Sequence, residues 1–128
     1  MKLRVSEVDA FFYPDVMVTC DSRDRNTDMY KQYPVLIAEV LSESTAEYDR
    51  SFKFACYKKI STLRDYLLIS QDVYSVEHYH LNDSGEWIRT DHTKDECFYL
   101  APLDLHVAVS DIYADVDGVV TMEEKFRK

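Results

Sequence analysis

Two carboxylates lie in the sequence where they could bind a metal ion together. Glu39 lies inside Pro34–Leu41, a run that is apolar on both alternating faces and therefore predicts a central strand covered on both sides. A buried, ionised carboxylate is costly unless a cation or hydrogen bonds compensate it. Asp15 follows Pro14 at the mouth of a second predicted strand, Val16–Cys20. If these strands are neighbours, both carboxylates converge, and such an oxygen donor set suits Mg²⁺.

The same pair has a simpler interpretation. Asp15 could cap a turn, and Glu39 could pair with a buried arginine. Residue types and spacing alone leave both interpretations open.

A helix is predicted directly after the Glu39 strand, because Ser44–Glu47 fits a capping box with Ser44 as the N-cap. Apolar residues then recur at helical spacing and predict a buried stripe: Tyr48, Phe52, Ala55, Cys56 and Ile60. Asp49, Lys53 and Tyr57 follow each other at four-residue spacing on an adjacent stripe and can face a common site. Lys53 could bring its charge to the two carboxylates, or pair with Asp49 on a solvated face. Spacing alone favours the second arrangement.

At these residues the chain resembles a known family. Pro14–Val18 and Pro34–Thr45 look like the signature of the Uma-two family of restriction endonucleases within the PD-(D/E)XK nuclease superfamily. Asp49–Tyr57, Asp65–Ile69 and Val76–Tyr79 continue the pattern over nearly the whole chain. The resemblance implies an α/β (α+β) fold with a restriction endonuclease-like mixed β-sheet flanked by helices. It also implies metal-dependent hydrolysis of DNA phosphodiester bonds.

The resemblance assigns roles to individual residues. Asp15 and Glu39 match the acidic ligands of one Mg²⁺ or Mn²⁺, with the Val40 carbonyl as a further ligand. The superfamily pattern places a lysine two residues after Glu39, where this chain has Leu41. Lys53 on the following helix matches the family's relocated lysine, since a long side chain can reach the same point from another backbone position. The expected catalytic set is therefore Asp15, Glu39 and Lys53.

The resemblance also predicts that residues 1–128 form a single nuclease-like domain that is shortened at its N-terminus. Family members carry a further region before the strand that Asp15 opens, whereas here Met1–Phe12 precede it. A partner chain could supply the missing part, and a homo-oligomer is one such arrangement. The abundant tyrosines would suit an interface, although packing at the edge of the core explains them equally well.

The composition limits which other functions and partners the chain could have. No apolar run approaches the roughly 20 residues that a membrane-spanning helix needs, so no membrane partner is expected. Three cysteines without a paired spacing indicate reduced thiols in a cytoplasmic protein. A net charge of −9 opposes nucleic acid over most of the surface. A local set of cations in and after the helix is the exception: Arg50, Lys53, Lys58, Lys59 and Arg64.

Further along the chain, Asn82–Gly85 predicts a hairpin turn between strands at Val73–Leu81 and Glu86–Thr90. His78 and His80 alternate on the first of these strands, so both rings point the same way. They could bind a transition metal, but no third ligand is evident and a polar strand face explains them more simply. A turn is also predicted at residues 26–28.

Two functions follow from the sequence. The first is a divalent-metal-dependent DNA endonuclease that uses Asp15, Glu39 and Lys53. The second is a non-catalytic binding or assembly module with the nuclease fold, acting as an oligomer. The intact acidic and lysine residues favour the first, whereas the short N-terminal part and the acidic composition favour the second.

Overall fold

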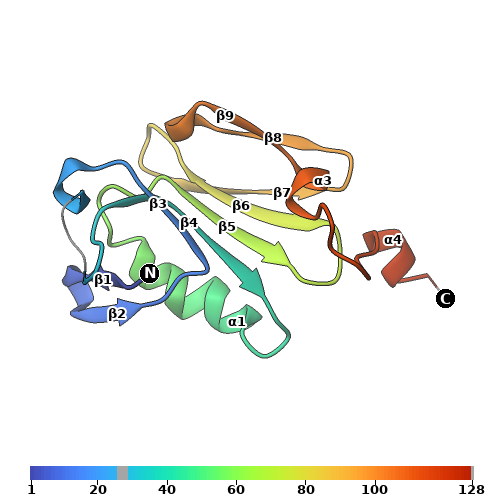
Figure 1. Cartoon of the computed structure of the whole chain (residues 1–128), viewed down its shortest axis with the longest axis horizontal. Coiled ribbons are helices and arrows are strands. Elements are labelled where there is room, and N and C mark those ends of the chain that lie inside the picture. Colours follow the sequence, from blue (N-terminus) through green and yellow to red (C-terminus); the bar gives the residue numbers. More distant parts are fainter. Residues whose placement is uncertain (26–28, 128) are drawn as a thin grey trace.

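The computed structural model describes residues 1–25 and 29–127, so the turn predicted at 26–28 lies outside the described residues. A five-stranded sheet forms the centre of the chain, in the order β3-β4-β5-β6-β7 (Figure 1). Its strands are β3 (Val16–Thr19), β4 (Pro34–Leu41), β5 (Asp65–Ser70), β6 (Ser75–Leu81) and β7 (Trp87–Thr93). β4 and β5 are parallel, and the other neighbouring pairs are antiparallel. The predicted mixed sheet is confirmed.

A helix carries the chain from β4 across to the parallel strand β5. It consists of α1 (Ala46–Tyr48), a π-helical segment η3 (Asp49–Lys53) and α2 (Phe54–Tyr57). The predicted capping box is wrong, because Thr45 is the N-cap residue and makes no side-chain cap bond. The predicted apolar stripe is wrong at Tyr48, Phe52 and Ala55, which are exposed. The stripe of Asp49, Lys53 and Tyr57 faces inward instead.

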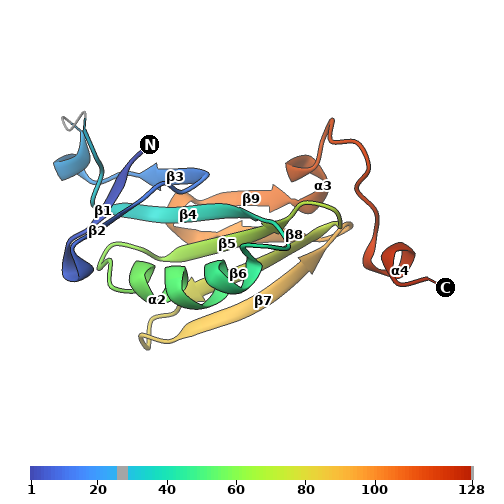
Figure 2. The ribbon, with the colours of Figure 1, turned by 90° about the horizontal axis from the view of Figure 1, so that it is seen from below.

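One face of the sheet packs against this helix and against a small sheet of β1 (Leu3–Val5) and β2 (Ala10–Phe12) (Figure 2). Alternation along β4 turns Ile37, Glu39 and Leu41 toward this side, because successive side chains of a strand point to opposite faces. The buried apolar side chains here are Leu3, Val5, Phe12, Ile37, Leu41, Phe54, Cys56, Tyr57, Ile60, Leu63, Tyr66 and Leu68. Glu39 is therefore a carboxylate in an apolar layer.

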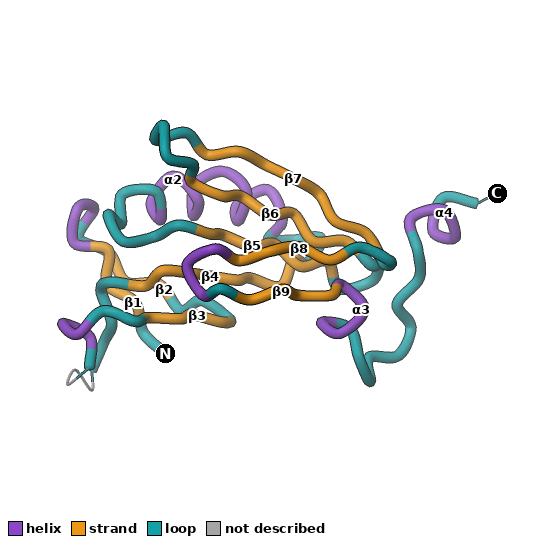
Figure 3. The backbone as a smooth tube through the Cα atoms, turned by 90° about the horizontal axis from the view of Figure 1, so that it is seen from above, coloured by secondary structure: helices purple, strands orange, loops and turns teal. Residues whose placement is uncertain are grey.

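The other face is covered by the hairpin of β8 (Cys97–Leu100) and β9 (Leu105–Ala108), together with the short helix α3 (Val109–Ile112) (Figure 3). The sheet was expected to be flanked by helices, whereas on this face a hairpin covers it. Its core comprises Leu36, Ala38, Leu67, Val76, Phe98, Leu100, Val109 and Tyr113. The chain ends in a further short helix, α4 (Met122–Lys125). Three-residue 3₁₀ turns occur at Ser6–Val8, Ser22–Asp24 and Ala101–Leu103.

The predicted β6–β7 hairpin is confirmed. Asn82 accepts hydrogen bonds at Oδ1 from the backbone N–H groups of Ser84 and Glu86, each at 2.9 Å. Gly85 has a φ of 80°, which glycine adopts without the steric cost that other residues incur. The hairpin brings β7 alongside β6, and with it Arg89 and His92.

Candidate active site

One hydrogen bond joins Asp15 to Glu39, and a second joins Asp15 to the adjacent Val40, at the mouth of β3 and β4. The backbone N–H of Asp15 donates to Oε1 of Glu39 at 2.9 Å, and the N–H of Val40 donates to Oδ2 of Asp15 at 2.8 Å. The antiparallel pairing of Val16 with Ala38 places the two residues at this spacing. The structure therefore brings together the two acidic residues that the sequence singled out.

The second oxygen of Glu39 accepts from the helix. Nζ of Lys53 lies 2.6 Å from Oε2 of Glu39, and the hydroxyl of Tyr57 donates to the same oxygen at 3.1 Å. Glu39 is only 2% exposed, so the ammonium and the two hydrogen bonds offset the cost of burying its charge. The cation beside Glu39 is a lysine, and the simpler interpretation with a buried arginine is wrong.

Asp49 adds a third carboxylate to this group. It is 2% exposed, and its Oδ1 lies 3.3 Å from Nζ of Lys53 but makes no hydrogen bond with any described residue. Lys53 thus serves two buried carboxylates, and the expectation that the pair of Asp49 and Lys53 lies on a solvated face is wrong. Among the described contacts, Asp15, Glu39 and Asp49 have one ammonium between them. The site carries a surplus of negative charge.

The electrostatics keep Lys53 and Tyr57 protonated. Burial alone would lower the pKa of the Lys53 ammonium, but the hydrogen bond and charge of Glu39, together with Asp49, raise it above its ordinary value. Burial raises the pKa of the Tyr57 phenol far above its ordinary value, and the nearby charge of Glu39 raises it further. Both groups are therefore hydrogen-bond donors at neutral pH.

Two contacts hold the π-helical segment that carries Lys53. Arg50 makes a bidentate pair with the buried Glu77 of β6, in which Nε donates to Oε1 at 3.0 Å and Nη2 donates to Oε2 at 3.0 Å. The hydroxyl of Tyr66 on β5 donates to the Asp49 carbonyl at 3.1 Å. π-helical turns inside helices occur frequently at functional sites. Here the segment is tied to two strands, which fixes the base of the Lys53 side chain.

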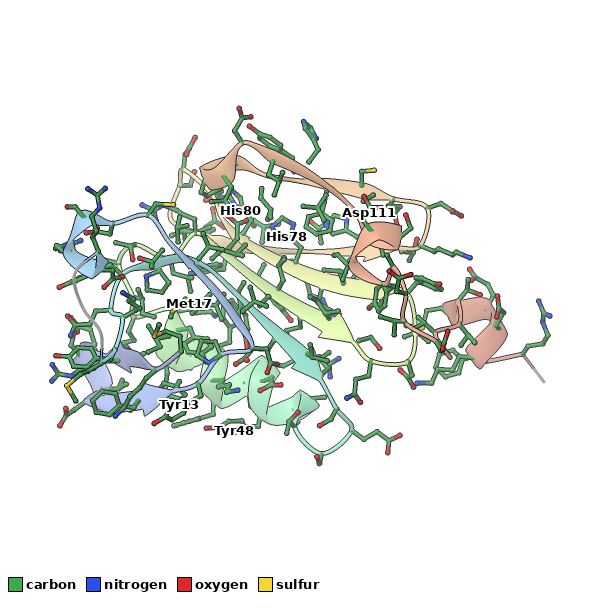
Figure 4. All side chains as sticks on the ribbon, in the orientation of Figure 1. Tyr13, Met17, Tyr48, His78, His80 and Asp111 are labelled. Carbon is green, nitrogen blue, oxygen red and sulfur yellow. The ribbon has the colours of Figure 1, made fainter. Side chains whose placement is uncertain are left out.

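The site opens to solvent at Asp15. This residue is exposed and lines a surface hollow of about 380 Å³ whose lining does not include Glu39 or Lys53, and its Oδ1 has no hydrogen-bond partner among residues 1–25 and 29–127. Tyr13 and Tyr48 are exposed on the helix side of the sheet (Figure 4). A ligand from solvent can reach the carboxylate of Asp15 without displacing the core.

The donors of this site are of the kind that a hard divalent cation binds, although both oxygens of Glu39 already accept hydrogen bonds. The only described group of three residues with ligand atoms within 4.8 Å of one another is Asp65, His78 and His80. The site beside Glu39 offers carboxylate oxygens, one of them open and another buried without a hydrogen bond, and it has excess negative charge. Mg²⁺ and Mn²⁺ favour oxygen ligands of this kind, supplemented by water and substrate phosphates. The described contact of Val40 is the hydrogen bond from its N–H to Asp15. The role of the Val40 carbonyl as a metal ligand stays a prediction.

The sequence analysis missed one residue that could bind a metal. Asp65, at the start of β5, lies opposite His80 in the sheet register and contacts both His78 and His80. The register between strands is not readable from one chain, and the sequence pointed to Asp65 only as the first residue of Asp65–Ile69, a segment that resembles the family pattern. The prediction that both histidine side chains point to the same side of the strand is consistent with these contacts.

The described part of the chain contains no helix long and apolar enough to cross a membrane. All three cysteines are free: Cys20, Cys56 and Cys97.

Comparisons with known proteins give the family and the fold of the chain. Residues 1–110 match the model of the Uma2 family, whose description is "Putative restriction endonuclease". A crystal structure of "a putative nuclease belonging to DUF820" from Anabaena variabilis superposes with a TM-score of 0.69 at 17% identity, covering 88% of this chain and 64% of that one. At this identity the likeness shows the fold, and it confirms the restriction endonuclease-like architecture.

Two uncharacterized proteins of Synechocystis sp. are similar in sequence. One, slr1290, is 39% identical over 113 residues, which are 88% of this chain and 60% of the relative. The other, sll1609, is 43% identical over 93 residues, which are 71% of this chain and 52% of the relative. The chain therefore spans between half and two thirds of the length of these relatives.

Proposed function

Because the chain belongs to the Uma2 family, we propose that it is a nuclease that hydrolyses DNA phosphodiester bonds with a divalent cation, using Asp15, Glu39 and Lys53. The observation that carries this proposal is the contact of the Lys53 ammonium with the buried Glu39, beside the open carboxylate of Asp15. A merely structural ion pair would not need a further carboxylate at the surface. Asp15 and Glu39, with the carbonyl of Val40, would hold the cation.

A bound Mg²⁺ or Mn²⁺ would lower the pKa of a coordinated water and neutralise charge on the phosphate. The protein's own part follows from its protonation states. Lys53 is an ammonium with a raised pKa, so it donates a hydrogen bond to the attacking water or to a phosphate oxygen and does not act as the base. Tyr57 holds Oε2 of Glu39 from the buried side, which leaves the carboxylate in one orientation.

Several broader features of the proposal rest on the sequence. We propose that residues 1–128 act as one nuclease-like domain in the cytoplasm, a compartment in which its three free cysteines would stay reduced. A homo-oligomer is a further proposal, and sedimentation velocity of the whole chain tests it. A second copy could cover the exposed aromatic side chains near the site, such as Tyr13 and Tyr48.

The test is cleavage of supercoiled plasmid and of a labelled duplex with Mg²⁺ or Mn²⁺, with EDTA as the metal-free control. We expect cleavage by the wild-type chain and its loss in Glu39→Gln and in Lys53→Met. Lys59→Met is the matched control, because Lys59 is an exposed lysine just beyond the same helix. Equal cleavage by all four proteins would contradict the proposal and point to a contaminating nuclease.

The net charge of −9 favours one alternative, a non-catalytic module with the nuclease fold. It predicts that the wild-type chain does not cleave under any metal condition, while it binds DNA or a protein partner equally well with and without Glu39. Metal titration by calorimetry separates the two functions, since the catalytic proposal requires metal binding that Glu39→Gln weakens.

A further inference from the structure

A second cluster of possible metal ligands lies on the opposite face of the sheet from Glu39. Nε2 of His78 lies 2.7 Å from Oδ1 of Asp65, and Nδ1 of His80 lies 2.8 Å from the same oxygen. One ligand atom from each residue lies within 4.8 Å of the others. Asp65 lies on β5 and the two histidines lie on β6, so two neighbouring strands bring three donors to one point. Figure 4 shows both histidines between the sheet and the β8–β9 hairpin.

One carboxylate oxygen of Asp65 lacks a hydrogen-bond partner in this cluster. The residue is 0% exposed, and its Oδ2 is buried without a hydrogen-bond partner among the described residues. A buried acceptor that lacks a partner is destabilising, more so when it is charged. A cation held by this carboxylate and the two imidazoles would satisfy it.

His92 supports the cluster from β7. Its Nε2 lies 3.3 Å from Nδ1 of His78, and its ring stacks on Phe98 with 4.6 Å between centroids. Histidines that bind metals usually engage their second ring nitrogen in a hydrogen bond, which fixes the tautomer and the ring orientation. His78 has this arrangement, because Nδ1 faces His92 while Nε2 faces Asp65. His92 is thus an orienting partner rather than a ligand.

The cluster is accessible from solvent. His78, His80 and His92 line a hollow of about 490 Å³ together with Ile88, Phe98 and Tyr99. The side chain of His80 is 38% exposed, whereas that of Asp65 is almost completely buried. Three protein ligands beside an open hollow are the arrangement of a zinc site that retains one position for water or another small ligand.

The chemistry of these donors separates this cluster from the Glu39 site. Imidazole nitrogens favour transition metals, whereas Mg²⁺ favours oxygen. The sheet itself lies between the two groups, because Glu39 faces the helix and Asp65 faces the β8–β9 hairpin. We propose that Asp65, His78 and His80 form a second, independent site for a transition metal, with Zn²⁺ as the cation that fits best.

The site is tested with Co²⁺, whose visible absorption reports coordination, and with calorimetric titration of Zn²⁺. The untagged chain is first stripped with EDTA, and Glu39→Gln serves to remove the other candidate site. We expect one equivalent of Zn²⁺ to bind both to the wild type and to Glu39→Gln. His80→Ala should weaken binding by at least about 10-fold, since even an outer partner of a metal site contributes 10- to 100-fold.

His106→Ala is the matched control, because it is the one histidine of the four that lies outside the cluster. It is exposed on β9, and its loss should leave Zn²⁺ affinity and the Co²⁺ spectrum unchanged. Circular dichroism confirms that each variant is folded. The wild-type spectrum decides independently of any variant: no Co²⁺ absorption above that of free aqueous Co²⁺ overturns the proposal. Equal losses of Zn²⁺ affinity in His80→Ala and His106→Ala would also overturn it. The same holds if Glu39→Gln no longer binds Zn²⁺.

Discussion

Nζ of Lys53 and Oε2 of Glu39 lie 2.6 Å apart, and they come from a helix and a strand that the chain joins through a short turn. The superfamily pattern would place this lysine at position 41. In this chain that position is Leu41, which shares a sheet face with Glu39 and packs in the core under the helix. An ammonium from the helix reaches the carboxylate while the strand keeps its apolar contact. Lys53 therefore supplies a positive charge to Glu39 while Leu41 adds to the core.

Replacing Lys53 with methionine should destabilise the fold and abolish cleavage. The variant keeps the volume but leaves Glu39 and Asp49 buried without their shared cation, which should cost about 3 kcal/mol of unfolding free energy. Cleavage should fall by about 10²- to 10³-fold, as for the loss of one preorganised donor. Urea denaturation followed by circular dichroism measures the first effect, and a plasmid assay the second.

Mn²⁺ should then stabilise Lys53→Met more than the wild type, because a cation that binds only the folded state raises the unfolding free energy. Lys59→Met should match the wild type in stability, cleavage and response to Mn²⁺. Equal Mn²⁺ effects on Lys53→Met and the wild type would show that removing the ammonium does not strengthen cation binding near these carboxylates.

Asp15→Asn should separate activity from stability. The amide oxygen of asparagine can still accept the N–H of Val40, and the residue is exposed, so the unfolding free energy should change by no more than about 0.5 kcal/mol. Loss of the negative charge should nevertheless remove the open metal ligand and reduce cleavage by at least about 100-fold. Asp83→Asn, at the exposed β6–β7 turn, is the control. Full activity in Asp15→Asn would exclude this carboxylate from the chemistry.

Tyr57→Phe should change how stability depends on alkaline pH. Burial first, and the charge of Glu39 second, raise the pKa of this phenol above the value of 10.0 that it has when free. The unfolded chain therefore releases the proton first, so the contribution of Tyr57 is complete below pH 10 and is lost as the pH rises above it. The variant should lose about 2 kcal/mol at neutral pH, because a buried hydrogen bond to a charged acceptor is removed. Above pH 10 its stability should fall less steeply.

Urea midpoints measured from neutral pH to about pH 11 give both quantities for Tyr57→Phe. The exposed Tyr13 is the control position, and Tyr13→Phe should follow the wild-type profile throughout. Parallel profiles for wild type and Tyr57→Phe would mean that this phenol titrates alike in the folded and unfolded chain.

Local patterns predicted the central strands, whereas the expectation that Asp15, Glu39 and Lys53 meet at one site came from the family resemblance. The apolar run with one carboxylate at Glu39 indicated a covered strand, and β4 has the predicted bounds Pro34–Leu41. The four-residue spacing of Asp49, Lys53 and Tyr57 identified one helical stripe. Spacing could not say which stripe is buried, because the sequence offered a second, apolar stripe through Tyr48 and Phe52. The ion pair of Lys53 with Glu39 of the sheet determines which stripe faces inward.

Long-range pairing accounts for what the sequence did not predict. Asp65 meets His80 only because β5 and β6 pair in one particular register, and a shift by one residue would send Asp65 to the other face. The β8–β9 hairpin covers the second face because the alternating side chains of Phe98 and Leu100 need an apolar partner. Neither relationship has a local signature.

Arg50 and Arg89 should stabilise the fold in a non-additive way, because both bind the same buried carboxylate. Arg50 pairs with Glu77 from the helix, and Arg89 approaches it from β7 at 2.7 Å. Either arginine can compensate Glu77 when the other is removed. The side chains of Arg50 and Arg89 are 39% and 48% exposed, so solvent screens their charges. Replacing either one with methionine should therefore lower the unfolding free energy by only about 0.5–1 kcal/mol.

The double variant should cost about 1 kcal/mol more than the sum of the single losses, because Glu77 is then buried without a cation. Unfolding free energies of the wild type, the two single variants and the double variant form the required cycle. Arg64→Met, an exposed position after the helix, replaces Arg89→Met in a control cycle with Arg50→Met and should be additive. If the Arg50–Arg89 cycle is also additive, Glu77 does not depend on having one of its two arginines. The helix that carries Lys53 would then be held to β6 by packing alone.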